Sequence, residues 1–181
     1  MRMILLLLGV ALTAAAPDDG PHYTADGKML RPENYREWVF LSSGLGMTYG
    51  PLARPGEPRF DNVFASREAY RSFLETGRWP DKTVLVLEVR ASESKGSINQ
   101  GGHYQTAGVV GVEVHVKDEK RFARKWAFFG FPEGVTAAEE MPASHGCFAC
   151  HEPNGAVDTT FVQFYPTLVK VAKEKGTYKD K

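Results

Sequence analysis

Cys147-Phe148-Ala149-Cys150-His151 is the stretch around which this 181-residue chain is organised, because it holds both of the cysteines. On a helical turn, positions i, i+3 and i+4 share one face, and Cys147, Cys150 and His151 have that spacing. Two thiols one turn apart can form thioethers with the two vinyl groups of a haem, and His151 can then reach the iron as the proximal ligand. The motif predicts one covalently bound haem c, with the rest of the chain forming a pocket around it.

The first residues have the pattern of a secretory signal peptide. Arg2 precedes an apolar run over residues 4–11, and small residues lead up to Pro17. Cleavage is expected after Ala15 or Ala16, which makes residues 1–16 the signal peptide. The run is too short for an ordinary transmembrane helix, and no later stretch is long and apolar enough to form one. The pattern predicts a soluble mature protein that is periplasmic or secreted.

Two other interpretations of the cysteines stay open. A redox disulfide of the thioredoxin type is expected near a βαβ pattern, whereas this motif follows a loop-rich stretch over residues 132–146. A zinc site would need a second pair of ligands. Without a third cysteine, that pair would have to come from His22, His103, His115 or His145. Haem c is favoured because the motif is specific in an exported chain with no other cysteine.

Charge and length limit the class of protein further. The chain has 22 Lys and Arg residues and 22 Asp and Glu residues, so its formal net charge is zero. No global field therefore favours nucleic acid or an anionic membrane as a partner. The mature length suits one domain with a substantial core. We expect a flexible leader over residues 17–31, one domain over 32–176 and a polar tail over 177–181.

Hydrophobic periodicity predicts a sheet with a few helices. The clearest alternation places Val110, Val112, Val114 and Val116 on one face of a strand, and Gly111, Glu113, His115 and Lys117 on the other. Further strands are expected at residues 38–41, 60–64, 83–90 and 126–131, helices at 66–77 and 166–175, a helical turn at 33–37 and a loop over 42–59. This pattern predicts an α+β domain, mainly an antiparallel β-sheet with two or three helices.

Several further segments accompany the haem motif between residues 32 and 168. They are Tyr35-Arg36-Glu37-Trp38-Val39, Asn62-Val63-Phe64 with Glu68-Ala69-Tyr70, Thr76-Gly77-Arg78-Trp79-Pro80-Asp81, Val112-Glu113 with Val116-Lys117-Asp118, Trp126-Ala127-Phe128, and Phe161-Val162-Gln163-Phe164-Tyr165-Pro166. Together they resemble the cytochrome P-460 family, whose relatives include cytochrome c′-beta. The haem motif alone occurs in many families, but the combination is much more specific.

The resemblance implies a periplasmic, mostly antiparallel β fold, usually homodimeric, with one covalent haem whose distal side is open to small nitrogen ligands. It implies nitric oxide and hydroxylamine as candidate ligands, weak oxidase or peroxidase activity at most, and a cytochrome as redox partner. Family members that oxidise hydroxylamine carry an extra bond from a lysine to the porphyrin. Leu87 fills that lysine's position here, and Lys82 lies only at the start of the strand. The departure favours the gas-binding branch without the cross-link, although by its pattern Leu87 could equally be ordinary core.

Glu113 is the candidate distal acid-base group, because it interrupts an apolar strand and matches the family's distal acid. From the residues alone, an exposed strand position explains it equally well. His115, two residues further on, is expected to face water. His103 and His145 are expected to be solvated in glycine-rich loops.

Met47 keeps a second class of function open. A methionine as sixth iron ligand would make the protein an electron carrier with a closed, six-coordinate haem. In a glycine-rich loop, however, such a residue often merely packs. Four aromatic residues can wall the haem or simply fill the core, namely Phe64, Phe128, Phe129 and Phe131.

Overall fold

The computed structural model describes residues 18–47 and 56–180, so the predicted signal peptide lies outside the described residues. At its centre is a five-stranded antiparallel sheet in the order β2-β3-β4-β5-β6, in which each strand pairs with the next along the chain. The strands are β2 (Val39–Leu45), β3 (Phe60–Ala65), β4 (Val84–Ser94), β5 (His103–Lys117) and β6 (Trp126–Pro132). The short strands β1 (Met29–Leu30) and β7 (Ala137–Ala138) pair separately.

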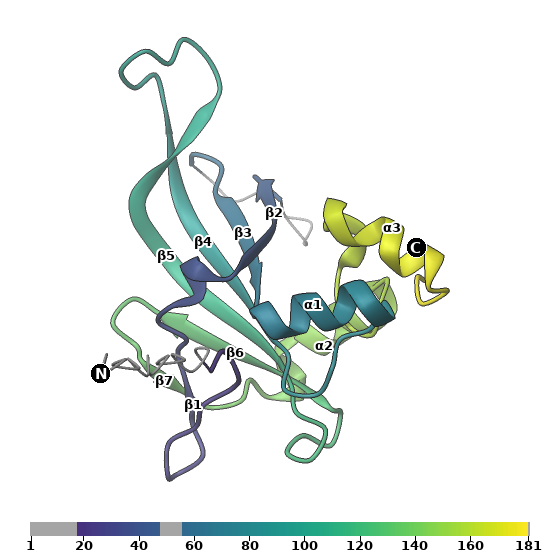
Figure 1. The fold of residues 1–181 in the computed structure, drawn as a ribbon. Helices are drawn as coiled ribbons and strands as arrows, with labels where there is room; N and C mark the ends of the chain where they lie inside the picture. Colours follow the sequence, from purple (N-terminus) through teal and green to yellow (C-terminus); the bar gives the residue numbers. More distant parts are fainter. Residues whose placement is uncertain (1–17, 48–55, 181) are drawn as a thin grey trace, which may run out of the picture.

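Three α-helices gather on one side of the sheet (Figure 1): α1 (Arg67–Thr76), α2 (Cys147–Asn154) and α3 (Pro166–Glu174). The described residues also form short 3-10 helices, namely η1 (Tyr35–Glu37), η2 (Ala143–His145) and η3 (Val162–Phe164). The prediction of an α+β domain with a mainly antiparallel sheet and two or three helices is confirmed. Within residues 18–47 and 56–180, no helix has the length and apolar character needed to cross a membrane.

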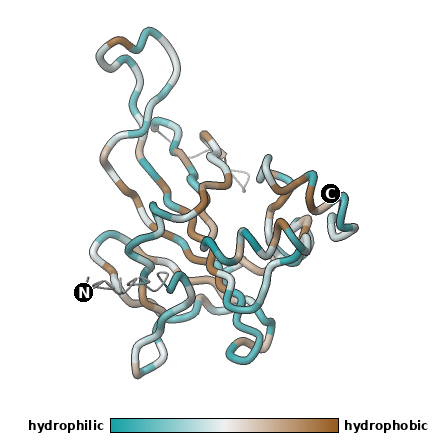
Figure 2. The backbone as a smooth tube through the Cα atoms, viewed as in Figure 1, coloured by the Kyte–Doolittle hydropathy of each residue, from teal (hydrophilic) through white to brown (hydrophobic). Residues whose placement is uncertain are grey.

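Alternating side chains in the central strands divide the core in two. On one face, Val84 and Val86 of β4 pack with valines of β5 and with Phe129 and Phe131 of β6. On the other face, Leu85 and Phe128 pack with buried residues of the helices, namely Ala69, Phe73, Phe148, Leu168 and Ala172. Hydrophobic stretches follow these central strands in Figure 2. Among the described residues, the three α-helices all pack on this second face, which also carries the candidate site.

Helix α1 illustrates how local sequence builds the helical side of the core. Ala69 and Phe73 share a helical face at i, i+4, and both are buried. Gly77 ends the helix with a φ of 70°, a left-handed conformation that glycine adopts without strain. A Cβ at Gly77 would also lie 2.6 Å from the Cβ of Lys175, so the chain after α3 can approach only because glycine is there. The predicted helix over 66–77 begins one residue later, after Ser66, whose side chain makes no capping hydrogen bond.

Strand β5 departs from the predicted alternation at Val110. The pairing with β4 shifts register between Gly111 and Val109, which leaves Val110 as an extra residue. Its side chain is 39% exposed and does not join the three buried valines that follow. The prediction was wrong here because the partner strand creates the bulge, and a period-two pattern does not reveal it.

The predicted loop over residues 42–59 begins as strand. Strand β2 continues to Leu45 because Ser43 and Gly44 pair with Asn62 and Asp61 of β3. The Ser43 hydroxyl also donates a hydrogen bond to the side-chain oxygen of Asn62 at 2.8 Å. Pairing with a neighbouring strand outweighs the turn-forming local composition. Residues 48–55 of this segment lie outside the described residues.

Residues 18–31, predicted to be a flexible leader, are packed onto the domain. Arg67 donates two parallel hydrogen bonds to Asp19, from Nε at 2.7 Å and from Nη2 at 2.8 Å. Met29 is fully buried in the core on the face without helices. The predicted tail is also docked, since the Thr177 hydroxyl donates to the Gly77 carbonyl at 2.7 Å. These contacts join residues far apart in sequence, so local composition does not predict them.

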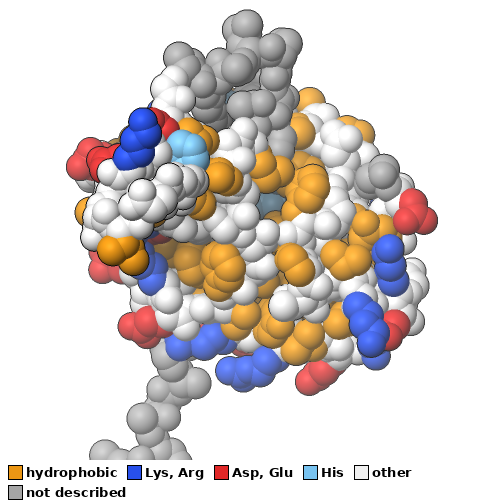
Figure 3. Space-filling model, turned by 90° about the horizontal axis from the view of Figure 1, so that it is seen from above, with side chains coloured by type: hydrophobic (Ala, Val, Ile, Leu, Met, Phe, Trp, Pro, Cys, Tyr) orange, Lys and Arg blue, Asp and Glu red, His pale blue; other side chains and the backbone are white. Residues whose placement is uncertain are grey.

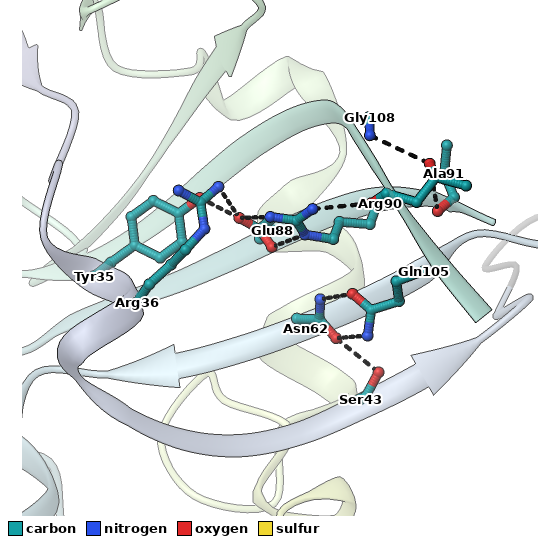
Figure 4. A network of polar contacts seen from close by, with 10 residues as sticks. Tyr35, Arg36, Ser43, Asn62, Glu88, Arg90, Ala91, Gln105 and Gly108 are labelled. Carbon is teal, nitrogen blue, oxygen red and sulfur yellow. Dashed lines mark hydrogen bonds and ion pairs between the residues drawn. The ribbon is translucent and has the colours of Figure 1, made fainter.

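Glu88 follows Leu87 in β4, and its side chain points to the opposite face of the sheet. Its carboxylate is 2% exposed and accepts hydrogen bonds from the Tyr35 hydroxyl, from Arg36 and from Arg90 Nε, the last at 2.5 Å (Figure 4). Burial alone would raise the pKa of Glu88, but the hydrogen bonds from Arg90, Tyr35 and Arg36 lower the pKa overall. Burial and the bond to Glu88 raise the pKa of Tyr35 to about 12. The network ties η1 to the strand whose other face carries Leu87.

Candidate haem site

A cavity of about 260 Å³ lies between the helix-bearing face of the sheet, helix α2 and the turn η3. Figure 3, which views the molecule from above, shows hydrophobic side chains gathered around a hollow. The lining comes from the sheet (including Val63, Leu85, Leu87, Glu113, His115 and Phe128), from α2 (Cys147, Cys150 and His151) and from other segments (including Met47, Met141, Phe161, Phe164 and Tyr165). The five residues predicted to form the site all line this cavity; their roles stay predictions.

The register of the sheet explains why the strand residues meet there. Leu87 pairs with Glu113, and in the next row Leu85 pairs with His115, which in turn pairs with Phe128 of β6. Residues two apart on a strand point to the same face. The side chains of both rows therefore enter the cavity, while Glu88 and the valines of β5 point to the opposite face.

Helix α2 presents the three motif residues to the cavity. It begins after Gly146, which has a φ of 88°, and its first residue is Cys147. Both cysteines are free and half-buried. Burial raises the pKa of the Cys147 thiol, and the charge of Glu113 adds to that shift. Met141 lies beside this end of the helix, with its sulfur 3.7 Å from the Cys147 sulfur.

His151 is held in one tautomer. Its Nδ1 lies 2.8 Å from the carbonyl oxygen of Thr159, and because a carbonyl can only accept, Nδ1 carries the proton. The Nε2 lone pair is then available to a metal, as in most histidine ligands. Phe161 and Phe128 contact the imidazole, with ring centroids at 4.3 and 4.7 Å. Burial lowers the pKa of His151, while the Thr159 bond opposes this shift, so the ring is neutral at pH 7.

His115 does not face water, so that prediction is wrong. It is buried and stacked on Phe128, with centroids 4.0 Å apart and planes 14° apart, and Trp126 lies 4.4 Å away. Its Nε2 is 3.2 Å from the hydroxyl of Thr159. Burial, followed by the nearby His151, lowers the pKa of His115 well below its ordinary value. The spacing from Glu113 places both side chains on one face of the strand, but it gives no sign that His115 is covered, because Glu113 itself is exposed.

Glu113 lies in the cavity wall, and its side chain remains exposed to solvent through the cavity.

Met47 also lines the cavity and packs tightly on Gly44. A Cβ atom added at Gly44 would lie 2.4 Å from the Met47 sulfur. His103 is exposed as expected, but it begins strand β5 rather than lying in a loop, and it pairs with Glu57 at 3.2 Å. The exposed His145 lies 3.5 Å from the Cys147 sulfur.

Of the four candidate wall phenylalanines, only Phe128 borders the cavity and packs on its side of the sheet. Phe129 also borders the cavity, but its side chain packs with Phe64 and Phe131 in the core on the opposite face. Sequence reasoning missed Phe161 and Phe164, which line the cavity from the segment before α3. Their signal was present, because they belong to one of the segments that carried the family resemblance.

The residues present fit a haem. The cavity is lined mainly by apolar and aromatic side chains, two free thiols stand one helical turn apart, and the adjacent imidazole has its Nδ1 satisfied and Nε2 available. The zinc alternative finds less support. Across the part of the chain that the structure describes, no three His, Cys, Asp or Glu side chains gather closely enough to hold a metal ion.

Comparison with protein families agrees with this geometry. The family model described as Cytochrome P460 matches residues 32–162. A match over this much of the chain defines the class of protein as a haem-binding cytochrome. The chain belongs to the cytochrome P460 family. A search among curated proteins found no match.

Proposed function

We propose that this protein carries one haem c, linked to Cys147 and Cys150 with His151 as proximal iron ligand, and that it binds small nitrogen ligands at an open distal site. Nitric oxide is the first proposed ligand and hydroxylamine the second, with slow oxidase or peroxidase turnover as a secondary activity. One observation carries the proposal: three side chains with haem-attachment spacing share one face of α2 and line a single, mainly apolar cavity.

The proximal side of the site is preorganised by the protein. A bound haem supplies an iron coordination position that small ligands can occupy. His151 presents Nε2 because the Thr159 carbonyl engages Nδ1, and Phe161 and Phe128 restrict rotation of the ring. The aromatic surfaces also exclude water from this part of the cavity, which strengthens electrostatic interactions inside it.

Glu113 supplies the acid-base group of the proposal. A carboxylate in the cavity wall can take a proton from a small ligand such as hydroxylamine and pass it on. Its contact with solvent lets it exchange that proton with water. Its direct cross-strand partner is Leu87, an aliphatic side chain that neither donates nor accepts a proton.

Leu87 supports a haem without a lysine cross-link. An aliphatic side chain has no nucleophilic atom that could add to the porphyrin. Among the described residues that line the cavity, none is a lysine. We therefore propose ligand binding as the main activity and assign hydroxylamine oxidation a minor part.

An electron carrier is the second candidate function, and Met47 is the observation that favours it. Its thioether lines the cavity, where it could serve as a sixth ligand. The two proposals differ in iron coordination: an open site reacts readily with added ligand, and a closed site reacts reluctantly.

Optical spectra of the purified exported protein test the choice. We expect a high-spin ferrous spectrum that changes on addition of carbon monoxide or nitric oxide, and that is the same in Met47→Leu. A low-spin ferrous spectrum that resists ligand and becomes high-spin in Met47→Leu would establish the electron carrier.

The proposal includes a periplasmic or secreted location, a homodimer and a redox partner such as another cytochrome. The signal peptide pattern over residues 1–16 supports export. Fractionation of cells that express the full chain tests the location, and light scattering of the purified protein tests the dimer.

A further inference from the structure

We propose that His115 is a positioning residue for the proximal ligand: through the Thr159 hydroxyl it holds the Thr159 carbonyl against His151 Nδ1. The inference rests on the proposed haem site and goes beyond it, because it assigns a role to a residue outside the attachment motif. Strand β5 then serves both sides of the haem, with Glu113 for the distal side and His115 for the proximal side.

Thr159 is the link between the two histidines. Its hydroxyl lies 3.2 Å from His115 Nε2, and its carbonyl oxygen lies 2.8 Å from His151 Nδ1. The two imidazoles also meet edge to face, with centroids 5.2 Å apart and planes 76° apart. A shift of Thr159 away from His115 would therefore lengthen or misalign the hydrogen bond on the proximal ring.

His115 is itself held firmly. Phe128 stacks on one side of its ring, and Trp126 lies 4.4 Å away. Phe128 also contacts His151, with centroids 4.7 Å apart. Side chains packed in this way cannot change rotamer without moving the wall, so His115 offers Thr159 a fixed partner.

The turn that carries Thr159 has a conformation that needs outside support. Asp158 has a φ of 50°, a region that residues other than glycine seldom adopt. Gly155 is packed so closely that a Cβ would lie 2.8 Å from the Thr159 carbonyl carbon. Trp79 Nε1 donates to the Thr160 hydroxyl at 2.8 Å, and Lys117 Nζ lies 3.7 Å from Asp158 Oδ2. His115 completes a set of contacts that aim the Thr159 carbonyl at His151.

The contact between His115 and Thr159 should affect how strongly the His151 imidazole donates electrons to a bound iron. A hydrogen bond from the second ring nitrogen to a carbonyl raises the basicity of a metal-bound imidazole and fixes its orientation. A more basic imidazole favours ferric over ferrous iron. Loosening the Thr159 carbonyl should therefore raise the reduction potential of the haem and weaken the iron–histidine bond.

Three variants of the full-length holoprotein test the proposal. His115→Phe keeps an aromatic ring in the stack but removes the nitrogen, Thr159→Val removes the hydroxyl, and Thr159→Ser retains it. At the midpoint potential of the parent, we expect the ferrous-to-ferric ratio to be several-fold higher in His115→Phe and in Thr159→Val than in the parent. In Thr159→Ser, which keeps the hydroxyl, the ratio should stay close to that of the parent. The iron–histidine stretching frequency should fall in the first two. Because both act through one contact, the double variant should shift no further than either single variant.

Unchanged potentials and stretching frequencies in both His115→Phe and Thr159→Val, with the parent carrying haem, would overturn the proposal for His115 alone. A parent without haem would instead overturn the proposed function, so the two failures are distinguishable. If His115→Phe does not fold, Thr159→Val decides the question with the aromatic stack intact.

Discussion

Leu87 on β4 and Glu113 on β5 are direct partners across the sheet, and both side chains enter the same cavity. Cβ atoms in such a pair lie roughly 4.5–5.5 Å apart. Any side chain at position 87 is therefore a neighbour of the carboxylate. Leu87 stands where the resemblance places the cross-linking lysine. The same residue is also the nearest cross-strand neighbour of Glu113, the candidate acid.

Replacing Leu87 with lysine should place an amine beside the Glu113 carboxylate in the wall of the cavity. We expect Leu87→Lys to retain haem and, when hydrogen peroxide is added as the two-electron oxidant, to form a lysine–porphyrin bond in a fraction of molecules. The new C–N bond replaces a porphyrin C–H bond, peroxide takes up the two electrons, and the Glu113 carboxylate can accept the proton that the ammonium group loses. Trypsin separates residues 83–90 from the haem peptide 126–170, since the cleavable residues nearest each segment lie at its ends. Mass spectrometry should find these two segments joined through haem in the variant and not in the parent.

Leu87→Arg is the matched control. Arginine carries the same charge but does not lose its proton, so it should not form the bond. Joined peptides in the parent would contradict the assignment of Leu87. The absence of joined peptides in Leu87→Lys would show that the lysine does not reach the porphyrin from this position.

Glu113→Gln should leave haem loading and nitric oxide binding intact and shift the pH transition of the ferric spectrum downward. A carboxylate disfavours loss of a proton from water held near the iron, so removing its charge makes that loss easier. The expected shift is about one pH unit, corresponding to an interaction of about 1.4 kcal/mol. Turnover of hydroxylamine or peroxide should also slow, because the acid-base group is lost.

Glu119→Gln, an exposed residue beyond the end of β5, controls for a general change in charge. Its ferric titration should overlay that of the parent. If Glu113→Gln also overlays the parent in both titration and turnover, Glu113 is only a wall residue.

Asp19→Asn should loosen the contact between the N-terminal segment and α1 and lower the free energy of unfolding by about 1 kcal/mol, as expected for a partly buried ion pair. The hydrogen bond from Arg67 holds the pKa of Asp19 below its ordinary value of 3.8. Because the pKa of Asp19 is lower in the folded than in the unfolded protein, the ion pair stabilises the fold when the pH is above the unfolded pKa. This stabilisation is lost as the pH falls through the pKa of the folded protein. Denaturant unfolding should therefore separate variant and parent at pH 7 and bring them together near pH 2. Asp18→Asn, which is exposed, should match the parent throughout.

Glu88→Gln should lower the free energy of unfolding by roughly 2 kcal/mol, because an amide cannot accept all the hydrogen bonds that converge on the buried carboxylate. The low pKa of Glu88 adds stability above the ordinary value of 4.5, and this stability is lost as the pH falls below it. The haem spectrum should not change, because Glu88 lies on the face opposite the cavity. Glu93→Gln, exposed on the same strand, should stay within about 0.5 kcal/mol of the parent. A shifted haem spectrum in Glu88→Gln would show that the two faces of β4 are coupled.

Features that depend on residues close together in the sequence were predicted best. Alternation predicted β5, β-branched and aromatic apolar runs predicted β4 and β6, and Gly77 marked the end of α1. The spacing of Cys147, Cys150 and His151 predicted a shared helical face, and all three line one cavity. A periodic pattern reports which residues share a face, and it separated Glu113 from the buried valines of β5; the family resemblance, not the pattern, pointed to a pocket at Leu87 and Glu113.

Features fixed by distant partners could not be predicted in this way. The bulge at Val110 depends on the register with β4, and the packing of the leader depends on the bond between Asp19 and Arg67. His115 was expected to face water because an isolated histidine in a strand gives no sign of what covers it. Its cover comes from β6 and from the turn after α2, segments that only the folded chain brings together.

Mass spectrometry of the exported protein after proteolysis shows directly whether haem is attached at the Cys147–His151 motif. We predict one haem on the peptide that contains Cys147 and Cys150, and a single remaining thioether when either cysteine is replaced by alanine, visible as a shifted alkaline pyridine spectrum. His151→Ala should abolish the native spectrum while the haem stays attached. An exported protein that carries no haem on this peptide and instead binds zinc tightly would contradict the account.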